Sequence, residues 1–254
     1  MSKSIKLAAA AVAAVALLGG AAVAPAIAAT PTIKVATEGT YSPFTYHSAT
    51  SNKLVGYDVD VFTAVAKKAG YKVQFVETTW DGIFAGLESK RWDAIANQVT
   101  IRADRQAKYD LTAPYTVSNY VVVAKKSDTK ITKAEDIKGL TAAQSATSSF
   151  SDLAKSYGAK VETVEGFTQA IQLLGAGRVD VTINDSLAVL DYIKTNRDAN
   201  VKIAATFGDP SKQGFVFRKG STYLAKFNKA LASLTADGTI AKIGKKYFGK
   251  DVSK

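Results

Sequence analysis

Two segments of this chain repeat one another at nearly constant spacing, and this repeat constrains the fold more than any other feature. Residues 91–97 and 178–184 share an arginine, an aspartate and an asparagine in register, 87 positions apart. Just upstream, residues 72–77 (KVQFVE) are matched 88 positions later by residues 160–165 (KVETVE). Two matches in the same order indicate a duplicated strand–helix–strand unit. The chain is therefore expected to fold into two similar lobes.

In each copy an apolar strand runs into polar residues. In the first copy the strand is followed by Gln98, Thr100 and Arg105, and in the second it is followed by Asp185. Open α/β sheets hold their ligands at the carboxyl ends of strands. The guanidinium group of an arginine offers a fixed fork of donors that suits a carboxylate. A cation in one lobe facing an anion in the other would suit a zwitterion held between them.

Each of these polar residues also has a purely structural interpretation. Arg102 and Arg105 could simply pair with Asp104 on the surface, where such pairs contribute about 0–1 kcal/mol. Asp185 is a good N-cap for a helix that begins near Leu187. The hydroxyl groups of residues 145–149 could cap a helix, or the free amides there could bind a carboxylate. Spacing alone leaves these alternatives open.

The rest of the chain alternates strands with helices. Strands are expected near residues 32–36, 71–76, 94–96, 141–143, 160–164, 179–183 and 201–205, and helices near 59–69, 81–89, 148–157, 168–174, 187–195, 222–235 and 238–247. This alternation predicts an α/β fold, with parallel sheets and helices on both faces. Residues 120–124 and 214–217 are expected to be strands that cross between the lobes. Residues 209–213 are expected to be a return linker, and residues 109–115 a loop.

The first 28 residues are expected to be a cleaved signal peptide rather than part of the fold. Lys3 and Lys6 precede an apolar run, and residues 26–28 have the small-x-small form of a cleavage site. The alternative is a transmembrane anchor, because the run approaches the length of a span. Its small residues, paired glycines and proline favour the signal peptide. The mature chain would begin near Ala29 and would be exported.

Composition argues against several classes of function. The chain has no cysteine, so it has no lipid attachment site, disulfide or thiol nucleophile. His47 is the single histidine, which argues against a transition-metal site. The sequence shows no serine–histidine pattern and no phosphate-binding glycine loop, so neither a catalytic residue nor a cofactor is expected. The net charge of +11 comes from scattered lysines without interleaved aromatic residues, which favours a solvated basic surface over nucleic-acid binding.

At this point the residues resemble a known family. Residues 56–62 (GYDVDVF) look like the signature of solute-binding proteins for polar amino acids, the bacterial family 3 receptors of ABC importers. The resemblance continues through residues 41–44 and 101–105 to the ending at residues 236–239 and 246–249. It implies a two-lobed periplasmic-binding-protein fold of type II, in which each lobe is a mainly parallel sheet flanked by helices. Lobe I would comprise residues 29–117 and 214–254, lobe II residues 122–208, and the two hinge strands residues 118–121 and 209–213.

Carried over by position, the resemblance assigns roles to the candidate site residues. Arg105 would bind the α-carboxylate of an amino acid, with help from Thr100 and the backbone amide of Thr147 or Ser148. Asp185 and the carbonyl of Gln98 would take the α-ammonium group. Tyr41 and Trp80, which could otherwise just close the ends of a core, would sandwich the side chain, and Glu38 would lie near its far end. Arg102 departs from the family, which usually has threonine there.

The resemblance is closest to the cystine-binding branch. Residues 38–41, 80–82 and 97–101 carry this likeness, and they favour L-cystine as the ligand. The first alternative is a basic or other polar amino acid, because Glu38 could pair with a lysine or arginine ligand. The second is an enzyme, since cyclohexadienyl dehydratases, which act on arogenate or prephenate, share this fold. The expected partner is an inner-membrane ABC permease, and the protein is expected to be a periplasmic monomer without a lipid anchor.

Overall fold

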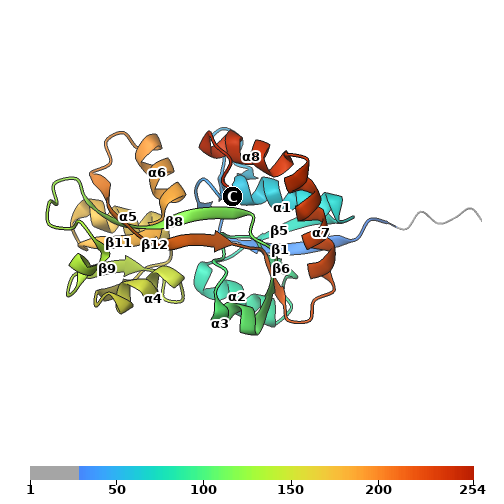
Figure 1. Cartoon of the computed structure of the whole chain (residues 1–254), viewed down its shortest axis with the longest axis horizontal. Helices are drawn as coiled ribbons and strands as arrows, with labels where there is room; N and C mark the ends of the chain where they lie inside the picture. Colours follow the sequence, from blue (N-terminus) through green and yellow to red (C-terminus); the bar gives the residue numbers. More distant parts are fainter. Residues whose placement is uncertain (1–28) are drawn as a thin grey trace, which may run out of the picture.

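The computed structural model describes residues 29–254, and the expected signal peptide, residues 1–28, lies outside the described residues. Figure 1 shows two lobes beside one another, joined by two long strands that run between them. Within residues 29–254 no helix is both long enough and apolar enough to cross a membrane. In the same range, no cluster of three or more histidine or acidic side chains is placed to hold a metal ion.

Each lobe is built on a five-stranded sheet, and the two sheets have the same design. In lobe I the order is β5-β1-β6-β13-β7, and in lobe II it is β10-β9-β11-β8-β12. Four strands of each sheet run in one direction, while β13 and β8 run against them. The bounds in lobe I are β1 Thr32–Thr37, β5 Lys72–Glu77, β6 Ala94–Ile95, β7 Tyr109–Leu111 and β13 Val216–Arg218. The bounds in lobe II are β8 Thr116–Lys125, β9 Thr141–Gln144, β10 Lys160–Thr163, β11 Val181–Asp185 and β12 Val201–Gln213.

Helices cover both faces of each sheet. In lobe I, α1 (Tyr57–Lys68), α7 (Tyr223–Ala236) and α8 (Thr239–Phe248) pack on one face, and α2 (Trp80–Glu88) packs on the other. In lobe II, α4 (Ser149–Ser156) and the short 3-10 helix η1 (Ala134–Ile137) pack on one face, opposite α5 (Phe167–Ala176) and α6 (Ser186–Thr195). A short helix, α3 (Ala103–Lys108), and a small sheet of β2 (Thr40–Tyr41), β3 (Thr45–His47) and β4 (Leu54–Val55) complete lobe I.

The repeat seen in the sequence is a repeat of structure. The strands β5 and β10 form the equivalent edges of the two sheets, and β6 and β11 occupy the equivalent third positions. The repeated aspartate makes the same bonds in both lobes. Asp93 Oδ2 accepts a hydrogen bond from the backbone amide of Lys34 at 3.0 Å, and Asp180 Oδ2 accepts one from Thr141 at 2.8 Å. The sequence match therefore marks corresponding strands, as the duplication predicts.

The crossing strands differ in part from the expectation. The strands β8 and β12 pair antiparallel along their length, and β12 continues to Gln213, which bridges to Thr100 of lobe I. Residues 209–213 therefore form the end of a strand rather than a linker. The crossing strand expected at residues 214–217 is wrong, because β13 lies inside the sheet of lobe I between β6 and β7. Pairing between β8 and β12 is interrupted between Phe207 and Ser211, where Gly208 has a φ of +67°.

Two short elements of lobe I were not expected from the sequence. Residues 109–111 form the edge strand β7 instead of a loop, and residues 103–108 form the helix α3. Both elements are short, with three and six residues, so neither offers enough positions for a periodic pattern. This matters for the site, because α3 carries Arg105.

Candidate functional site

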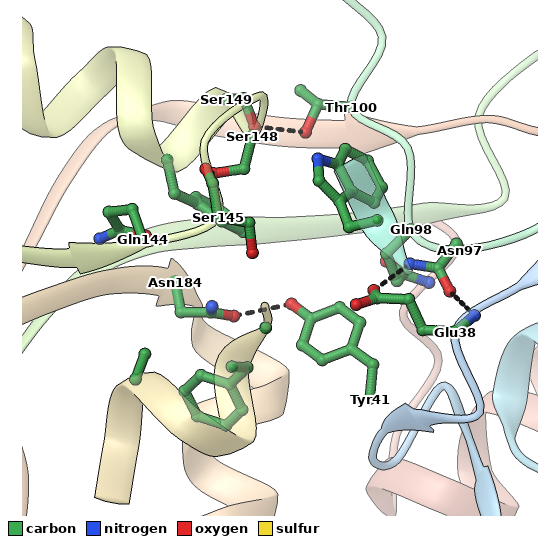
Figure 2. A pocket seen from close by; sticks show the side chains of 15 residues that line it. Glu38, Tyr41, Asn97, Gln98, Thr100, Gln144, Ser145, Ser148, Ser149 and Asn184 are labelled. Atoms are coloured by element: carbon green, nitrogen blue, oxygen red, sulfur yellow. Dashed lines mark hydrogen bonds between the residues drawn. The ribbon is translucent and has the colours of Figure 1, made fainter. Parts of the chain in front are cut away.

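A cavity lies between the two lobes, at the ends of the duplicated strands (Figure 2). The free space inside the cavity is about 50 Å³, so the cleft between the lobes is narrow. Its lining comes from both lobes. Lobe I contributes Glu38, Tyr41, Trp80, Asn97, Gln98 and Thr100, and lobe II contributes Gln144, Ser145, Ser148, Ser149, Phe150, Gly166, Phe167, Ala170 and Asn184.

The repeated asparagines organise the two sides of the cavity. Asn97 Oδ1 accepts hydrogen bonds from the Glu38 amide at 2.8 Å and from the Thr37 hydroxyl at 3.1 Å. Its amide nitrogen donates to Glu38 Oε2 at 2.5 Å, and this fixes the direction of the Glu38 side chain. On the other side, Asn184 Oδ1 accepts a hydrogen bond from the Tyr41 hydroxyl at 2.7 Å, which joins the lobes.

Gln98 is held in place by a carboxylate that the sequence interpretation did not assign. Asp58, which is fully buried, accepts hydrogen bonds from the Gln98 backbone amide at 2.7 Å and from Gln98 Nε2 at 2.6 Å. These bonds hold Gln98 at a φ of +49°, a left-handed conformation that a side-chain-bearing residue adopts at a cost. The Gln98 Oε1 atom is buried and has no hydrogen-bond partner among residues 29–254. Gln98 thus lines the cavity with an unused acceptor.

Glu38 is the acidic side chain of the cavity lining. Burial raises the pKa of Glu38 to about 7, although the hydrogen bond from Asn97 acts in the opposite direction, and the charge of Asp81 adds to the rise. Glu38 also lines a larger, open chamber that adjoins the cavity. Among the described residues, that chamber is lined by Glu77 and Glu165 and by no lysine or arginine. A ligand longer than the cavity would therefore pass Glu38 into an acidic, polar space.

Aromatic side chains form the apolar part of the wall. Tyr41 contacts Phe167 of lobe II edge-on, with ring centroids 6.1 Å apart, so the two rings meet across the cleft. Trp80 begins α2 and is 8% exposed, and its indole nitrogen is buried without a partner among the described residues. Tyr41 and Trp80 therefore both lie in the cavity wall.

Arg105 lies beside the cavity but does not line it. Its guanidinium group lies 5.4 Å from the centroids of both Trp80 and Phe84, and one nitrogen donates to the Thr100 carbonyl at 3.2 Å. The residue is 6% exposed and forms no ion pair with any residue in 29–254. Burial lowers the pKa of Arg105 to about 10, and the charge of Arg102 acts in the same direction. A buried cation without an anion is costly unless a partner arrives.

Asp185 also lies next to the cavity rather than in its lining. One carboxylate oxygen accepts a hydrogen bond from the Leu187 amide at 2.8 Å and caps α6, and the other accepts one from the Ser118 hydroxyl. Burial raises the pKa of Asp185 to about 6, against the effect of these hydrogen bonds. The helix-capping interpretation is therefore correct, and the carboxylate retains lone pairs for a further donor.

The predicted carboxylate-binding amides have different surroundings. The backbone amide and hydroxyl of Thr147 donate to Asp81 of lobe I at 3.0 and 2.7 Å, and Thr147 lines a shallow pocket with Arg105 instead of the main cavity. Ser148 does line the cavity, and its hydroxyl caps α4 by accepting from the Ser151 amide at 3.1 Å. Next to it, the Ser149 and Thr100 hydroxyls are 3.3 Å apart across the cleft.

Several lining residues were not singled out from the sequence. Asn97 and Asn184 had a signal, because they are the conspicuous pair in the repeat. Ser149 belongs to the hydroxyl-rich segment at residues 145–149. No sequence signal marked Gln144 or Phe167 as site residues, because a glutamine that ends a strand and a phenylalanine that begins a helix are common in cores and on surfaces alike.

The family model described as bacterial extracellular solute-binding proteins, family 3, matches residues 33–250. Among curated proteins, the chain is 55% identical over 223 residues to the L-cystine-binding protein TcyA of Bacillus subtilis (strain 168). That match covers 87% of this chain and 83% of the relative.

Two solved structures differ in how well they superpose. The L-cystine solute receptor of Neisseria gonorrhoeae, in its unliganded open conformation, is 45% identical, with a TM-score of 0.60 and coverage of 89% of this chain and 96% of the receptor. An ancestral arginine-binding protein bound to arginine is only 37% identical, yet its TM-score is 0.80, with coverage of 86% and 98%. The present arrangement of the lobes therefore resembles a ligand-bound form more than an open one.

Proposed function

The chain belongs to family 3 of the bacterial extracellular solute-binding proteins, and we propose that it captures an amino acid, with L-cystine favoured, between its two lobes. The observation that carries this proposal is the cavity between the lobes, which is walled by the ends of two duplicated strands. Beside it in lobe I, Arg105 is a buried cation that forms no ion pair within residues 29–254, and in lobe II Asp185 is a buried carboxylate. An amino acid carries the two complementary charges.

The choice of cystine rests on two features. Two of the similar proteins are named for cystine, the Bacillus subtilis protein and the Neisseria gonorrhoeae receptor. In addition, the cavity opens past Glu38 into an acidic chamber, which gives the second half of a long ligand somewhere to lie. One end of cystine would use Arg105, Thr100 and Ser148 for its carboxylate and Asp185 for its ammonium group. The disulfide would lie between Tyr41 and Trp80, and Glu38 would hold the distal ammonium group.

We also propose the setting in which this receptor works. Export through cleavage after residue 28 would place it outside the cytoplasm, as a periplasmic monomer without a lipid anchor. There it would deliver its ligand to an ABC permease in the membrane. Lobe I would comprise residues 29–117 and 214–254 and lobe II residues 122–208, with residues 118–121 and 209–213 as the hinge.

The ligand assignment is tested by thermal unfolding. A ligand at one hundred times its dissociation constant stabilises the native state by about 2.7 kcal/mol. For a chain of this size, each kcal/mol moves the midpoint by roughly 2–4 °C, so we expect a shift of several degrees. L-cystine should shift the midpoint more than arginine, lysine, histidine or glutamine at equal concentration. If arginine or lysine gives the largest shift, Glu38 binds the basic side chain of the ligand and the cystine assignment is wrong.

One observation favours an enzyme as the second candidate. A carboxyl group with a pKa of about 7, as burial gives Glu38, is suited to act as a general acid near neutral pH. The same screen should therefore include arogenate, followed by chromatography for phenylalanine. Release of phenylalanine that is lost in the Glu38→Gln variant would establish a dehydratase instead of a receptor.

Ligand binding should close the cleft. Because both lobes line the cavity, neither can make all its contacts while the cleft is open. We expect hinge rotation about β8 and β12, near Tyr120 and Gln213. Solution X-ray scattering should show a smaller radius of gyration with saturating ligand than without it. An unchanged radius would contradict closure between two moving lobes.

A further inference from the structure

Arg102 connects the two lobes outside the cavity. It precedes α3 in lobe I, and its side chain forms a fork with Asp104, in which Nε donates to Oδ1 at 2.6 Å and Nη2 to Oδ2 at 2.8 Å. The same Nη2 also donates to Oδ2 of Asp152 at 2.7 Å. Asp152 belongs to the first turn of α4 in lobe II. One guanidinium group is therefore shared by carboxylates of both lobes.

This contact differs in kind from the others across the cleft. The other side-chain hydrogen bonds between the lobes each have at least one neutral partner: Tyr41 with Asn184, Ser42 with Asp191, Thr168 with Thr40, Thr100 with Ser149, and Thr147 with Asp81. Every other ion pair among residues 29–254 lies within lobe I. Arg102–Asp152 is thus the ion pair that joins the lobes in the described part of the chain. Neither residue lines the cavity.

We propose that the Arg102–Asp152 pair is an electrostatic latch that holds the cleft closed and sets the rate of ligand release. The proposal rests on the proposed function, because a latch matters only if the lobes open and close around a ligand. The bonds between Arg102 and Asp104 lie within lobe I and persist when the cleft opens, so the guanidinium group stays oriented for Asp152. Without Arg102, closure would instead bring Asp152 toward the like charge of Asp104.

The latch should be modest in size and sensitive to salt. The side chains of Arg102, Asp104 and Asp152 are 32%, 58% and 52% exposed, and exposed pairs are weakened by solvent. Loss of the pair should therefore weaken ligand binding by about two- to fivefold at low ionic strength. The effect should shrink in 1 M salt, where the screening length is about 3 Å.

If Arg102 has a different role, the Asp152→Asn variant should change ligand affinity in the opposite direction. Burial chiefly lowers the pKa of Arg105, the charge of Arg102 acts in the same direction, and Asp104 and Asp152 oppose it, so all three charges are felt at Arg105. If Arg102 served only to attract the ligand carboxylate, removing the negative charge of Asp152 would tighten binding. If the pair is a latch, Asp152→Asn weakens binding. The sign of the change separates the two readings.

The test compares Asp152→Asn with Asp198→Asn in the full exported chain, using L-cystine as the probe. Asp198 is an exposed aspartate between α6 and β12, so its variant makes the same charge change away from the cleft. We expect Asp152→Asn to raise the dissociation constant two- to fivefold in low salt, mainly through faster dissociation, and Asp198→Asn to have little effect. When Asp152→Asn is added to the Arg102→Thr variant, affinity should fall no further, because the ion pair is already broken. Unchanged or tighter binding in Asp152→Asn, or additive losses in the double variant, would overturn the latch.

Failure of the ligand assignment would be visible separately. If the unaltered protein does not bind L-cystine, the same comparison is made with the amino acid that gives the largest thermal shift, since the latch residues do not line the cavity. If no amino acid binds, the proposed function fails, and the latch is tested by scattering from the free protein at low salt. Asp152→Asn should then have a larger radius of gyration than Asp198→Asn, and equal radii would rule out the latch.

Discussion

Replacing Arg105 by alanine should weaken amino-acid binding by roughly 2–5 kcal/mol, or about thirty- to several-thousandfold, as measured by calorimetry. The reason is that the ligand carboxylate would enter a dry site without its cation. Asp185→Ala should cost a similar amount, because it would leave the ligand ammonium group unpaired. Near-normal affinity in either variant would contradict the assignment of that residue to the ligand.

Matched variants separate binding from folding in this experiment. Arg178→Ala removes the same charge from an exposed arginine at the end of α5, so it should leave affinity unchanged. Asp185 also caps α6, and its loss to alanine should cost about 0.5–2 kcal/mol of stability in addition. Asp185→Asn keeps a good cap but removes the charge. We therefore expect Asp185→Asn to retain most of its stability while binding weakly.

Affinity should fall as the solution is acidified from pH 7.5 to pH 5. Burial raises the pKa of Glu38 to about 7 and that of Asp185 to about 6 in the free protein. Only the ionised carboxylates attract the ammonium groups of cystine, so bound ligand lowers both pKa values. Binding is then strongest above pH 7 and weakens below it, until the pH reaches the lower pKa values of the complex. Each titrating group can contribute up to tenfold per pH unit in that window.

Two variants assign the steps of this pH profile. In Glu38→Gln, the loss of affinity that begins near pH 7 on acidification should disappear, and the loss that is due to Asp185 should remain. Glu162→Gln, an exposed change on β10, should leave the whole profile as it is. Calorimetric titrations at several pH values would measure both. A flat profile in the unaltered protein would show that neither carboxylate meets a ligand cation.

The repeat made much of the architecture predictable. Residues 72–77 and 160–165 matched one another because they are equivalent edge strands, and Asp93 and Asp180 matched because each binds the strand beside it. The crossing of β12 was not predictable in the same way. Gly208 and Pro210 look like a linker in sequence, yet they form an irregularity within one long strand. Pairing with β8 on both sides, which no local pattern reveals, keeps the strand together.

The sequence indicated which residues lie in or beside the site, but it did not indicate which of them contact one another. Glu38, Tyr41, Trp80, Gln98, Thr100 and Ser148 line the cavity, and Arg105, Thr147 and Asp185 lie beside it. The roles of all nine toward a ligand remain predictions. Asp58 was visible in the signature, but its bonds to Gln98 depend on how α1 meets the end of β6. Likewise, the contact of Thr147 with Asp81 depends on how the lobes face one another, which a linear sequence does not record.

The interruption between Phe207 and Ser211 has a practical consequence for detecting the ligand. Asp209 lies on the exposed bulge of β12, above a groove lined by Tyr120, Tyr157 and Phe207. Because the chain contains no cysteine, Asp209→Cys would introduce a unique thiol for an environment-sensitive fluorophore. A dye held there would sense bending of the two crossing strands without touching the cavity. The receptor would then report its ligand as a change in emission, with the binding residues left unaltered.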